Sequence, residues 1–462
     1  MIKFGTDGWR AVIAEGFTFE NLTKVAKAHA KVLKRIESSK VVIGYDHRFL
    51  SEKFAKRVFD VFKSEGFEAY LTDRAVTTPE LSFSVKYMGF NGGVMITASH
   101  NPPQYNGYKI KEGFGGSATP SFVSMVEKEL ANVDSESPVD FKPAFLGVRG
   151  EYVSKVREFV NIEIFKDEDI LIVHDGMYGT AGGLLREILK DTRATVLDIR
   201  SSRDPLFGGH APEPIEKHLG ILKEKVRAVN ALMGIANDGD GDRVALVDEK
   251  GNFVNSQMVY VILLLHLIKN KNIKEGSIVK TVSTTYLADR ICKREGIELK
   301  EVPVGFKNIN EIILKERVIF GGEESGGYGF PHFLPERDGL LSALYVMEYV
   351  MLKGISLSSI LGEIAKEYGD AYYKRFDMHA DNTIKERLKH LIKIPPERVG
   401  SFKVKEVKTI DGLKLIFDED AWLLFRASGT EPLIRIYAEA PSPEITESLI
   451  KEGIELLESG GV

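Results

Sequence analysis

Gly93-Val-Met-Ile-Thr-Ala-Ser-His-Asn-Pro-Pro103 is the stretch from which the organisation of this chain can be worked out. Its apolar start, Gly93–Thr97, has the composition of a buried strand, and the strand stops at Ser99, His100 and Asn101, before two prolines. A strand that ends in a stiff polar loop presents a serine hydroxyl to a ligand. Taken alone, the segment is more simply a polar turn after a buried strand, so its meaning depends on the rest of the chain.

Length and composition exclude several classes of protein. A chain of 462 residues is too long for one hydrophobic core, so we expect three or four domains. The net charge of −5, without a basic block, argues against a nucleic-acid partner. The N-terminus has no signal-peptide core, and the longest apolar run, Met258–Ile268, is too short to cross a bilayer. Cys292 is the only cysteine, which excludes an internal disulfide and fits a reducing cytoplasm.

The same order of strands and helices is predicted three times. In the first unit the expected elements are a helix over Leu22–Ile36, a strand at Val41–Gly44, a helix capped by Ser51, a strand at Glu68–Leu71, a helix after Thr78-Pro79 and the strand Gly93–Thr97. In the second they are Ile170–Val173, helix Thr180–Leu189, Ala194–Ile199, helix His218–Val229 and Leu232–Ala236. In the third they are Ile278–Val282, helix Leu287–Glu295, Leu299–Val302, helix Asn308–Lys315 and Val318–Phe320. Alternating strands and helices predict right-handed α/β units with mixed, mostly parallel sheets.

The final portion has a different pattern. Strands are expected at Leu413–Phe417, Ala421–Phe425 and Leu433–Ala438, before a helix that Pro443 opens and Gly460-Gly461 closes. This is typical of a small α+β domain. The predicted fold class is therefore α/β, with three related units and a smaller C-terminal domain, and the predicted domains are 1–148, 149–249, 250–368 and 369–462.

Three unusual loops fall at equivalent places in the three units. Ser99 follows the third strand of the first unit, Asp238–Arg243 the third strand of the second, and Gly321–Gly327 the third strand of the third. Ligands bind beyond the carboxyl ends of strands in open α/β sheets. Since three accidental polar turns at matching positions are improbable, we expect the loops to converge on one cleft, and this favours a functional Ser99.

The second loop has the composition of a cation site. Asp238, Asp240 and Asp242 place three carboxylates within five residues, and these repel one another unless a hard cation such as Mg²⁺ or Ca²⁺ binds them. A solvated acidic turn is the plain alternative. An EF-hand loop would also use Glu249, but Arg243 stands where that loop needs glycine, and the flanking segments are predicted to be strands. Three protein carboxylates would leave room for a phosphate oxygen on Mg²⁺.

A loop in the last domain has the composition of a phosphate cradle. It is Arg426-Ala-Ser-Gly-Thr-Glu-Pro-Leu-Ile-Arg435, which supplies guanidinium, hydroxyl and backbone donors. A surface turn with incidental arginines is the alternative. Further basic groups near the expected cleft are Lys109 and Lys307, although most lysines are solvated surface charges.

Taken together, these segments resemble the signature loops of the α-D-phosphohexomutase family. They are Thr97–Pro102, Asp238–Arg243, Gly322–Gly326 and Arg426–Pro432, in the family's order, and Phe4–Arg10 resembles its N-terminal signature. The resemblance spans essentially the whole chain and implies four domains around a central cleft.

The resemblance also implies roles for individual residues. Ser99 would be a phosphoserine, and one of its oxygens would hold Mg²⁺ together with Asp238, Asp240 and Asp242. The residues implied to bind the substrate are Lys307, Glu323, Ser325, Arg426, Ser428, Gly429, Thr430 and Arg435. Those implied to surround the transferring group are Arg10, His100, Lys109 and Arg243. Lys109 is the candidate general base, and His332 is a second candidate.

The implied activity is the interconversion of hexose 1-phosphate and hexose 6-phosphate through a hexose 1,6-bisphosphate that reorients. We expect a cytoplasmic monomer or homodimer without nucleic-acid or membrane partners. The Glu323-Glu324-Ser325 segment resembles the glucose-preferring branch, with mannose as the runner-up. Gly327 stands where the phosphoglucosamine branch usually has histidine, which weakens that alternative. A Mg²⁺-dependent sugar-phosphate phosphohydrolase, with a structural Ser99, is an alternative of a different class, and a Ca²⁺-binding module is a third.

Overall fold

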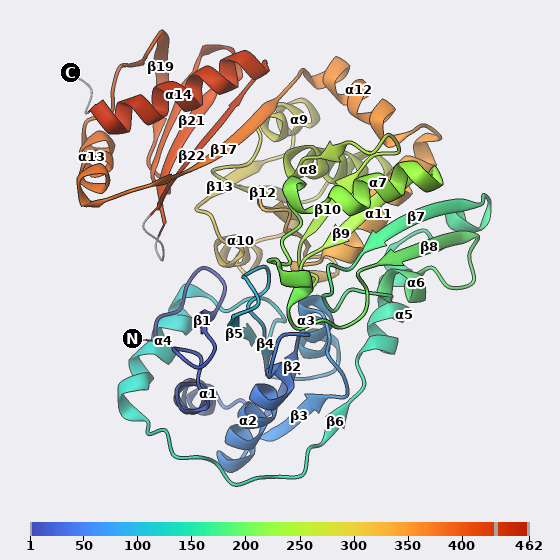
Figure 1. Ribbon diagram of the computed structural model, residues 1–462, viewed down its shortest axis with the longest axis vertical. Helices are drawn as coiled ribbons and strands as arrows, with labels where there is room; N and C mark the ends of the chain where they lie inside the picture. The colour runs from blue at the N-terminus through green and yellow to red at the C-terminus, as the bar shows by residue number, and fades with distance from the viewer. Residues whose placement is uncertain (1, 429–432, 460–462) are drawn as a thin grey trace. The chain divides into compact units, whose positions relative to one another are not determined.

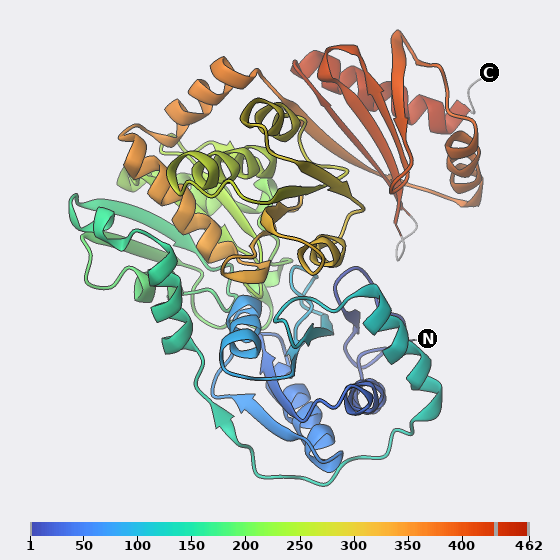
Figure 2. The same cartoon turned by 180° about the vertical axis from the view of Figure 1, so that it is seen from behind.

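The computed structural model describes residues 2–428 and 433–459. The chain divides into two compact parts, residues 1–275 with 305–359 and residues 276–304 with 360–462. Figures 1 and 2 show the elements of each part from opposite sides.

The first unit is built on a mixed sheet. Its strands, in spatial order, are β1 (Trp9–Val12), β5 (Tyr105–Glu112), β4 (Gly92–Ile96), β2 (Lys40–Tyr45), β3 (Glu68–Thr72) and β6 (Phe145–Leu146). Its helices are α1 (Phe19–Arg35), α2 (Ser51–Ser64), α3 (Thr78–Tyr87) and α4 (Pro120–Glu129). Strand β2 runs parallel to β3 and β4, whereas β5 is antiparallel to β1 and β4.

Both faces of this sheet are covered by helices. In β2, Val41 and Ile43 pack in the core that includes α1, α2 and α4, whereas Val42 packs with residues of α3 in a second core. The alternation follows from the period of two in a strand. One detail of the prediction is wrong. Ser51 does not cap α2, because left-handed Leu50 precedes the helix and the Ser51 hydroxyl donates to Asp46 instead.

The second unit has the same arrangement. Its strands, in spatial order, are β11 (Phe253–Val254), β10 (Val244–Val247), β9 (Met233–Asn237), β7 (Ile170–Asp175) and β8 (Ala194–Ile199), with helices α5 (Arg149–Phe159), α6 (Leu184–Ile188) and α7 (Gly220–Val229). Strands β9 and β10 flank the Asp238 loop, which confirms that it is not an EF-hand. Helix α6 is shorter than the predicted helix Thr180–Leu189. Gly183, just before α6, has a positive φ, and the Thr180 N–H donates to the Gly239 carbonyl instead of forming a helical bond.

The third unit supplies elements to both parts. In the second part, parallel β12 (Ser277–Thr281) and β13 (Leu299–Val302) are connected by α9 (Leu287–Glu295). In the first part, β14 (Val318–Gly322) pairs with β15 (Tyr328–Phe330), and β15 pairs with β16 (Leu334–Arg337), both antiparallel. The remaining helices are α8 (Ser256–Leu265), α10 (Phe306–Ile313), α11 (Gly339–Lys353) and α12 (Leu357–Tyr368).

The C-terminal domain is an antiparallel sheet with two helices (Figure 2). Its strands, in spatial order, are β17 (Tyr372–His379), β22 (Leu433–Ala440), β21 (Trp422–Ala427), β20 (Leu413–Phe417), β19 (Phe402–Lys408) and β18 (Arg398–Val399). Leu388 of α13 (Asn382–Lys393) and Leu449 of α14 (Pro443–Ser459) contribute to its core. The predicted stop at Gly460-Gly461 lies outside the described residues. The prediction of three α/β units and a smaller α+β domain is confirmed.

Among the described residues, no single helix combines the length and apolar composition that a membrane crossing requires. The bent pair α11 and α12 reaches both only when the two helices are taken together.

Candidate active site

The loops that follow β4, β9 and β14 lie together in the first part of the chain. The Ser99 hydroxyl after β4 donates to Asp238 Oδ2 after β9 over 2.6 Å. The Val244 N–H, at the end of the Asp238 loop, donates to the carbonyl of Gly326 after β14 over 2.9 Å. The expected convergence of the three loops is therefore present in the structure.

Ser99 has an unusual backbone conformation. Its φ is +51°, in the left-handed region that L residues rarely adopt, and the residue is buried. Its N–H donates to Thr97 Oγ1 over 2.8 Å. A Cβ atom on Gly239 would lie 2.6 Å from the Ser99 carbonyl oxygen, so glycine allows the Asp238 loop to approach the serine backbone.

The three aspartates fit a hard cation. Asp238, Asp240 and Asp242 are fully buried, and each offers a carboxylate oxygen within 4.8 Å of the others. Asp240 Oδ2 accepts from Thr78 Oγ1 at 2.6 Å and from Lys109 Nζ at 2.7 Å. The second oxygens, Asp240 Oδ1 and Asp242 Oδ1, are buried and have no hydrogen-bond partner among residues 2–428 and 433–459. Buried carboxylate oxygens without a donor are suited to Mg²⁺ or Ca²⁺.

The aspartates have different acidities. Burial, together with repulsion by Asp240 and Asp242, raises the pKa of Asp238 well above its ordinary value. Burial would also raise the pKa of Asp240, but the Lys109 ammonium holds it below its usual range. The raised pKa means that a negative charge on Asp238 is unfavourable beside the other two aspartates. A bound cation would stabilise the ionised form of Asp238.

Lys109 on β5 binds several carboxylates at once. Its Nζ lies 2.7 Å from Asp240, 2.8 Å from Asp242 and 2.8 Å from Asp7. Burial alone would lower the pKa of Lys109, but these three carboxylates raise it above its ordinary value. In this arrangement Lys109 is a cation, and the geometry favours charge neutralisation over proton abstraction as its role.

Arg337 is a site residue that the sequence did not reveal. Its Nη2 lies 2.7 Å from Asp242, and its Nη1 lies 3.6 Å from Glu323. It therefore joins the Asp238 loop to the Gly321–Gly327 loop. The Glu336-Arg337-Asp338 run precedes an apolar helix, so in the sequence it resembles an ordinary solvated helix start.

Arg10, His100 and Arg243 make contacts in the Ser99 and Asp238 loops. Arg10 Nη1 donates to Asn101 Oδ1 over 2.6 Å, and the Arg243 N–H donates to Asp238 Oδ1 over 3.1 Å. His100 Nδ1 is 3.5 Å from Ser99 Oγ. Burial and then the neighbouring guanidinium groups of Arg243 and Arg10 lower the pKa of His100 well below its ordinary value, so the imidazole is neutral.

The loop after β14 presents a carboxyl group of altered acidity. Glu323 Oε1 accepts from the Gly305 N–H over 2.9 Å, and burial raises the pKa of Glu323 to about 7. Ser325 is half-buried. Lys307 Nζ lies 3.4 Å from the Gly5 carbonyl.

His332 lies apart from these groups. It packs against Phe159, and its Nε2 is 3.0 Å from the Tyr345 hydroxyl. This aromatic environment places it away from the aspartates and weakens its candidacy as a base.

The predicted phosphate loop belongs to the second part of the chain. Arg426 on β21 and Arg435 on β22 are register partners, and Arg426 Nε donates to Asp411 over 2.6 Å. The Ser428 N–H donates to the Leu433 carbonyl over 2.9 Å. Gly429 and Thr430 lie outside the described residues.

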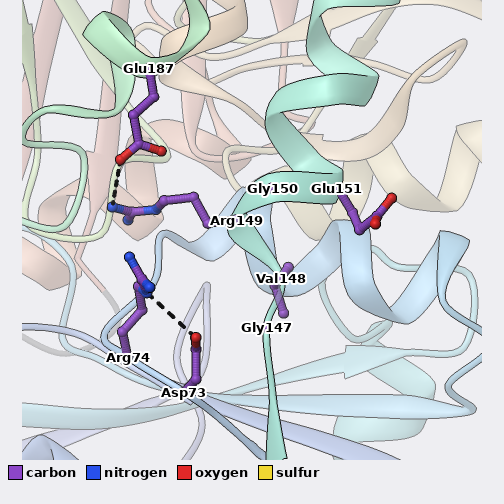
Figure 3. Close-up of a pocket in the computed structure, with 8 residues that line it drawn as sticks. All are labelled: Asp73, Arg74, Gly147, Val148, Arg149, Gly150, Glu151 and Glu187. Atoms are coloured by element: carbon purple, nitrogen blue, oxygen red, sulfur yellow. Dashed lines mark ion pairs between the residues drawn. The ribbon is translucent and has the colours of Figure 1, made fainter.

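A surface pocket of about 370 Å³ is lined by other residues of the first part. Figure 3 shows these residues. In this pocket Arg149 Nη1 lies 4.0 Å from Glu187 Oε1, and Arg74 Nε lies 3.5 Å from Asp73 Oδ1. The residues that line it are Asp73, Arg74, Gly147, Val148, Arg149, Gly150, Glu151 and Glu187. None of these is a predicted site residue, and the pocket carries both signs of charge.

Models of four domain families match the chain in order. They are phosphoglucomutase/phosphomannomutase alpha/beta/alpha domains I (residues 1–137), II (150–251) and III (255–368) and the C-terminal domain (386–455) of the same proteins.

The chain belongs to the phosphoglucomutase/phosphomannomutase family. A phosphoglucomutase/phosphomannomutase of Thermococcus kodakarensis is 31% identical over 98% of this chain and 98% of its own length. A probable phosphoglucosamine mutase of Pyrococcus abyssi is 32% identical over 98% of this chain and 97% of its own length. The crystal structure of a putative phosphomannomutase from Thermus thermophilus has a TM-score of 0.89 and 35% identity, over 99% of both chains.

Membership identifies the chain as a phosphohexomutase, an enzyme that moves a phosphoryl group within a sugar phosphate. The family does not decide the sugar, because its relatives carry names for glucose, mannose and glucosamine phosphates.

Proposed function

We propose that the protein interconverts hexose 1-phosphate and hexose 6-phosphate in the cytoplasm, with Ser99 as the phosphoryl carrier and glucose phosphates as the favoured substrates. The observation that carries this proposal is the contact of 2.6 Å between Ser99 Oγ and Asp238, inside a buried cluster of three aspartates. A serine hydroxyl in that place is within reach of any cation that the cluster binds.

The proposed transfer is balanced between two oxygen atoms. The bond between phosphorus and Ser99 Oγ breaks, and a bond forms between phosphorus and a sugar hydroxyl oxygen. The proton that the sugar hydroxyl loses is balanced by the proton that Ser99 Oγ gains. Ser99 returns to the hydroxyl that donates to Asp238. The bisphosphorylated sugar then reorients and returns its other phosphoryl group to Ser99. Mg²⁺ held by Asp238, Asp240, Asp242 and a phosphoserine oxygen would supply positive charge for the phosphoryl oxygens.

The protein's own cations support the same step. The guanidinium groups of Arg10 and Arg243 act electrostatically on His100, the residue after Ser99, and Lys109 lies against Asp240 and Asp242. Positive groups fixed before the reaction stabilise charge that develops on the transferring group. We propose that these three residues and the neutral His100 surround that group.

Substrate binding is proposed at two places. Glu323 and Ser325 would bind sugar hydroxyls, with Lys307 nearby. Arg426, Ser428, Gly429, Thr430 and Arg435 would bind the phosphate that does not react. Arg426 and Arg435 are register partners on adjacent strands, and two guanidinium groups at neighbouring positions can bind one phosphate together.

Phosphoglucosamine mutase activity is the second candidate, because a relative at 32% identity over nearly the whole chain is named a probable phosphoglucosamine mutase. Gly327 and the Glu323-Glu324-Ser325 segment favour glucose instead. Glucose and glucosamine differ only at carbon 2, so an activity assay distinguishes the two substrates better than the fold does.

A coupled assay with glucose, mannose and glucosamine 1-phosphates, Mg²⁺ and the matching bisphosphate tests the proposal. We expect the highest kcat/KM with glucose 1-phosphate, and intact-mass measurement should show a phosphate adduct that Ser99→Ala abolishes. Ser137→Ala, at an exposed serine, is the matched control. Release of inorganic phosphate without glucose 6-phosphate would instead identify a phosphohydrolase.

A further inference from the structure

Arg48 is a fully buried arginine beneath the Ser99 loop. Its Nη2 donates to the carbonyls of Ser99 and Asn101, both over 2.6 Å. Its Nη1 donates to the carbonyls of Pro102 over 2.8 Å and Tyr105 over 3.0 Å. Its side chain has an exposed fraction of 0%. One guanidinium therefore gathers four backbone carbonyls of the loop that carries the reactive serine.

The Asp46 carboxylate balances the charge of Arg48, and a network of hydrogen bonds connects Asp46 to the Ser99 N–H through Thr97. Arg48 Nε is 3.2 Å from Asp46 Oδ2, and that carboxylate also accepts from Thr97 Oγ1 over 2.6 Å. Thr97 Oγ1 in turn accepts the Ser99 N–H over 2.8 Å. The ring of Phe207 covers the guanidinium, with its centroid 5.0 Å from Arg48 Cζ. The charge is thus paired and hydrogen-bonded, as a buried arginine requires.

The network accounts for the conformation of Ser99. The carbonyl of Ser99 is bound to Arg48 and its N–H to Thr97, so both peptide groups of the residue are fixed. The left-handed φ of +51° is unfavourable for a residue with a Cβ, and the surrounding bonds must hold it. Charge-assisted hydrogen bonds are about twice as strong as neutral ones.

The network also affects the electrostatics of the loop. A carbonyl oxygen that faces a phosphoryl group repels it, because both carry negative charge. The oxygens of Ser99, Asn101 and Pro102 are directed to Arg48 and thus cannot turn to a group on Ser99 Oγ.

We propose that Arg48 is the positioning residue of the phosphoryl-transfer loop: it gathers the carbonyls of residues 99–105 and thereby fixes Ser99 Oγ in line for transfer. The inference rests on the proposed function of Ser99. Because Arg48 acts on the carrier and not on the sugar, its loss lowers kcat and leaves KM nearly unchanged.

The test compares Arg48→Met and Arg48→Lys with Arg57→Met, an α2 arginine whose ring contact is with Phe19. We expect kcat for glucose 1-phosphate to fall on the order of 100-fold in Arg48→Met, with KM within about threefold of wild type. Arg48→Lys keeps the charge without the planar fork and should recover only part of the rate. An unchanged kcat, or a loss confined to KM, would overturn the proposal.

Thr97→Val covers the case in which Arg48→Met fails to fold, since it removes the hydroxyl between Asp46 and the Ser99 N–H. It should also lower kcat and not KM. Amide exchange over residues 98–106 provides a readout without turnover, and we expect faster exchange in the variants than in Arg57→Met. If the wild-type enzyme is inactive on every hexose phosphate, the proposed function is rejected, and faster exchange in the variants then supports only the ordering of the loop by Arg48. Wild-type exchange with full kcat in both Arg48→Lys and Thr97→Val would reject the positioning role alone.

Discussion

At the scale of single residues, Gly239 shows how closely the Ser99 and Asp238 loops approach each other. An added Cβ would lie 2.6 Å from the Ser99 carbonyl oxygen, whereas the φ of Gly239 is outside the left-handed region, so the backbone itself tolerates alanine. Gly239→Ala should therefore push the aspartates away from Ser99 without unfolding the chain. We expect kcat to fall on the order of 100-fold at saturating glucose 1-phosphate.

The matched control for that substitution is Gly220→Ala. Gly220 is the first residue of α7, and its added Cβ meets no atom within 4 Å. Activity near wild type in Gly220→Ala and in Gly239→Ala alike would show that the close approach of the loops is not needed.

His29 supports a prediction about stability and pH. It is buried in α1, its Nδ1 lies 2.9 Å from the Tyr108 hydroxyl, and burial lowers the pKa of His29 to about 3. In the unfolded chain His29 binds a proton near pH 6.5, whereas in the folded protein its buried imidazole stays neutral down to about pH 3. The free energy of unfolding therefore decreases as pH falls from 6.5 toward 3. Between pH 8 and pH 5 the loss from this group should be about 2 kcal/mol.

His29→Gln removes this titrating group, and urea unfolding at pH 8 and pH 5 measures the effect. The variant should lose less stability between the two pH values than wild type does. His390→Gln, at an exposed position in α13, is the control. Equal pH dependence in wild type and His29→Gln would contradict the assignment.

At the scale of elements, the start of α3 connects the first unit to the aspartates. The Thr77 side chain and Glu80 form a capping box, which fixes the first turn of the helix. The Thr78 hydroxyl of that turn donates to Asp240 over 2.6 Å, and the Thr78 N–H donates to the Asp240 carbonyl over 2.8 Å. The helix start therefore orients a proposed metal ligand.

Thr78→Val keeps the shape of the side chain and removes the hydroxyl. Because partners of a metal ligand commonly change metal affinity by 10- to 100-fold, we expect the Mg²⁺ concentration for half-maximal activity to rise by roughly that factor. Ser82→Ala is the control, since Ser82 Oγ of the same helix has no hydrogen-bond partner in the described part of the chain. A Mg²⁺ titration in which Thr78→Val matches Ser82→Ala would exclude this role.

The elements also show what the sequence can predict. Runs such as Ala194–Ile199 and Leu413–Phe417 are strands over the predicted residues, because apolar and β-branched residues fill a buried sheet. Strand β5 was not predicted, although it carries Lys109. Its two lysines, Lys109 and Lys111, are buried and form ion pairs with carboxylates that are distant in the sequence. The spacing of apolar residues along the segment cannot indicate such burial.

At the scale of the whole molecule, some features of the candidate site can be predicted from the sequence and others cannot. The approach of Ser99 to the aspartates was predictable, because each lies in a short segment with its own chemistry at the end of a strand. Arg337 was not, because its partner Asp242 is 95 residues away and only folding brings the two together. The domain boundaries and the roles of the individual residues remain predictions.

Glucose 1-phosphate binding tests the proposed role of the second part of the chain. Arg435 should hold the phosphate that does not react, so Arg435→Met should raise KM for glucose 1-phosphate on the order of 10- to 100-fold, the usual loss for a charge-assisted hydrogen bond. The Mg²⁺ requirement should stay unchanged, because Asp238, Asp240 and Asp242 belong to the first part. Arg375→Met on β17 of the same sheet, which removes the pair with Asp377, is the control. A KM for Arg435→Met equal to that of Arg375→Met would place the phosphate elsewhere.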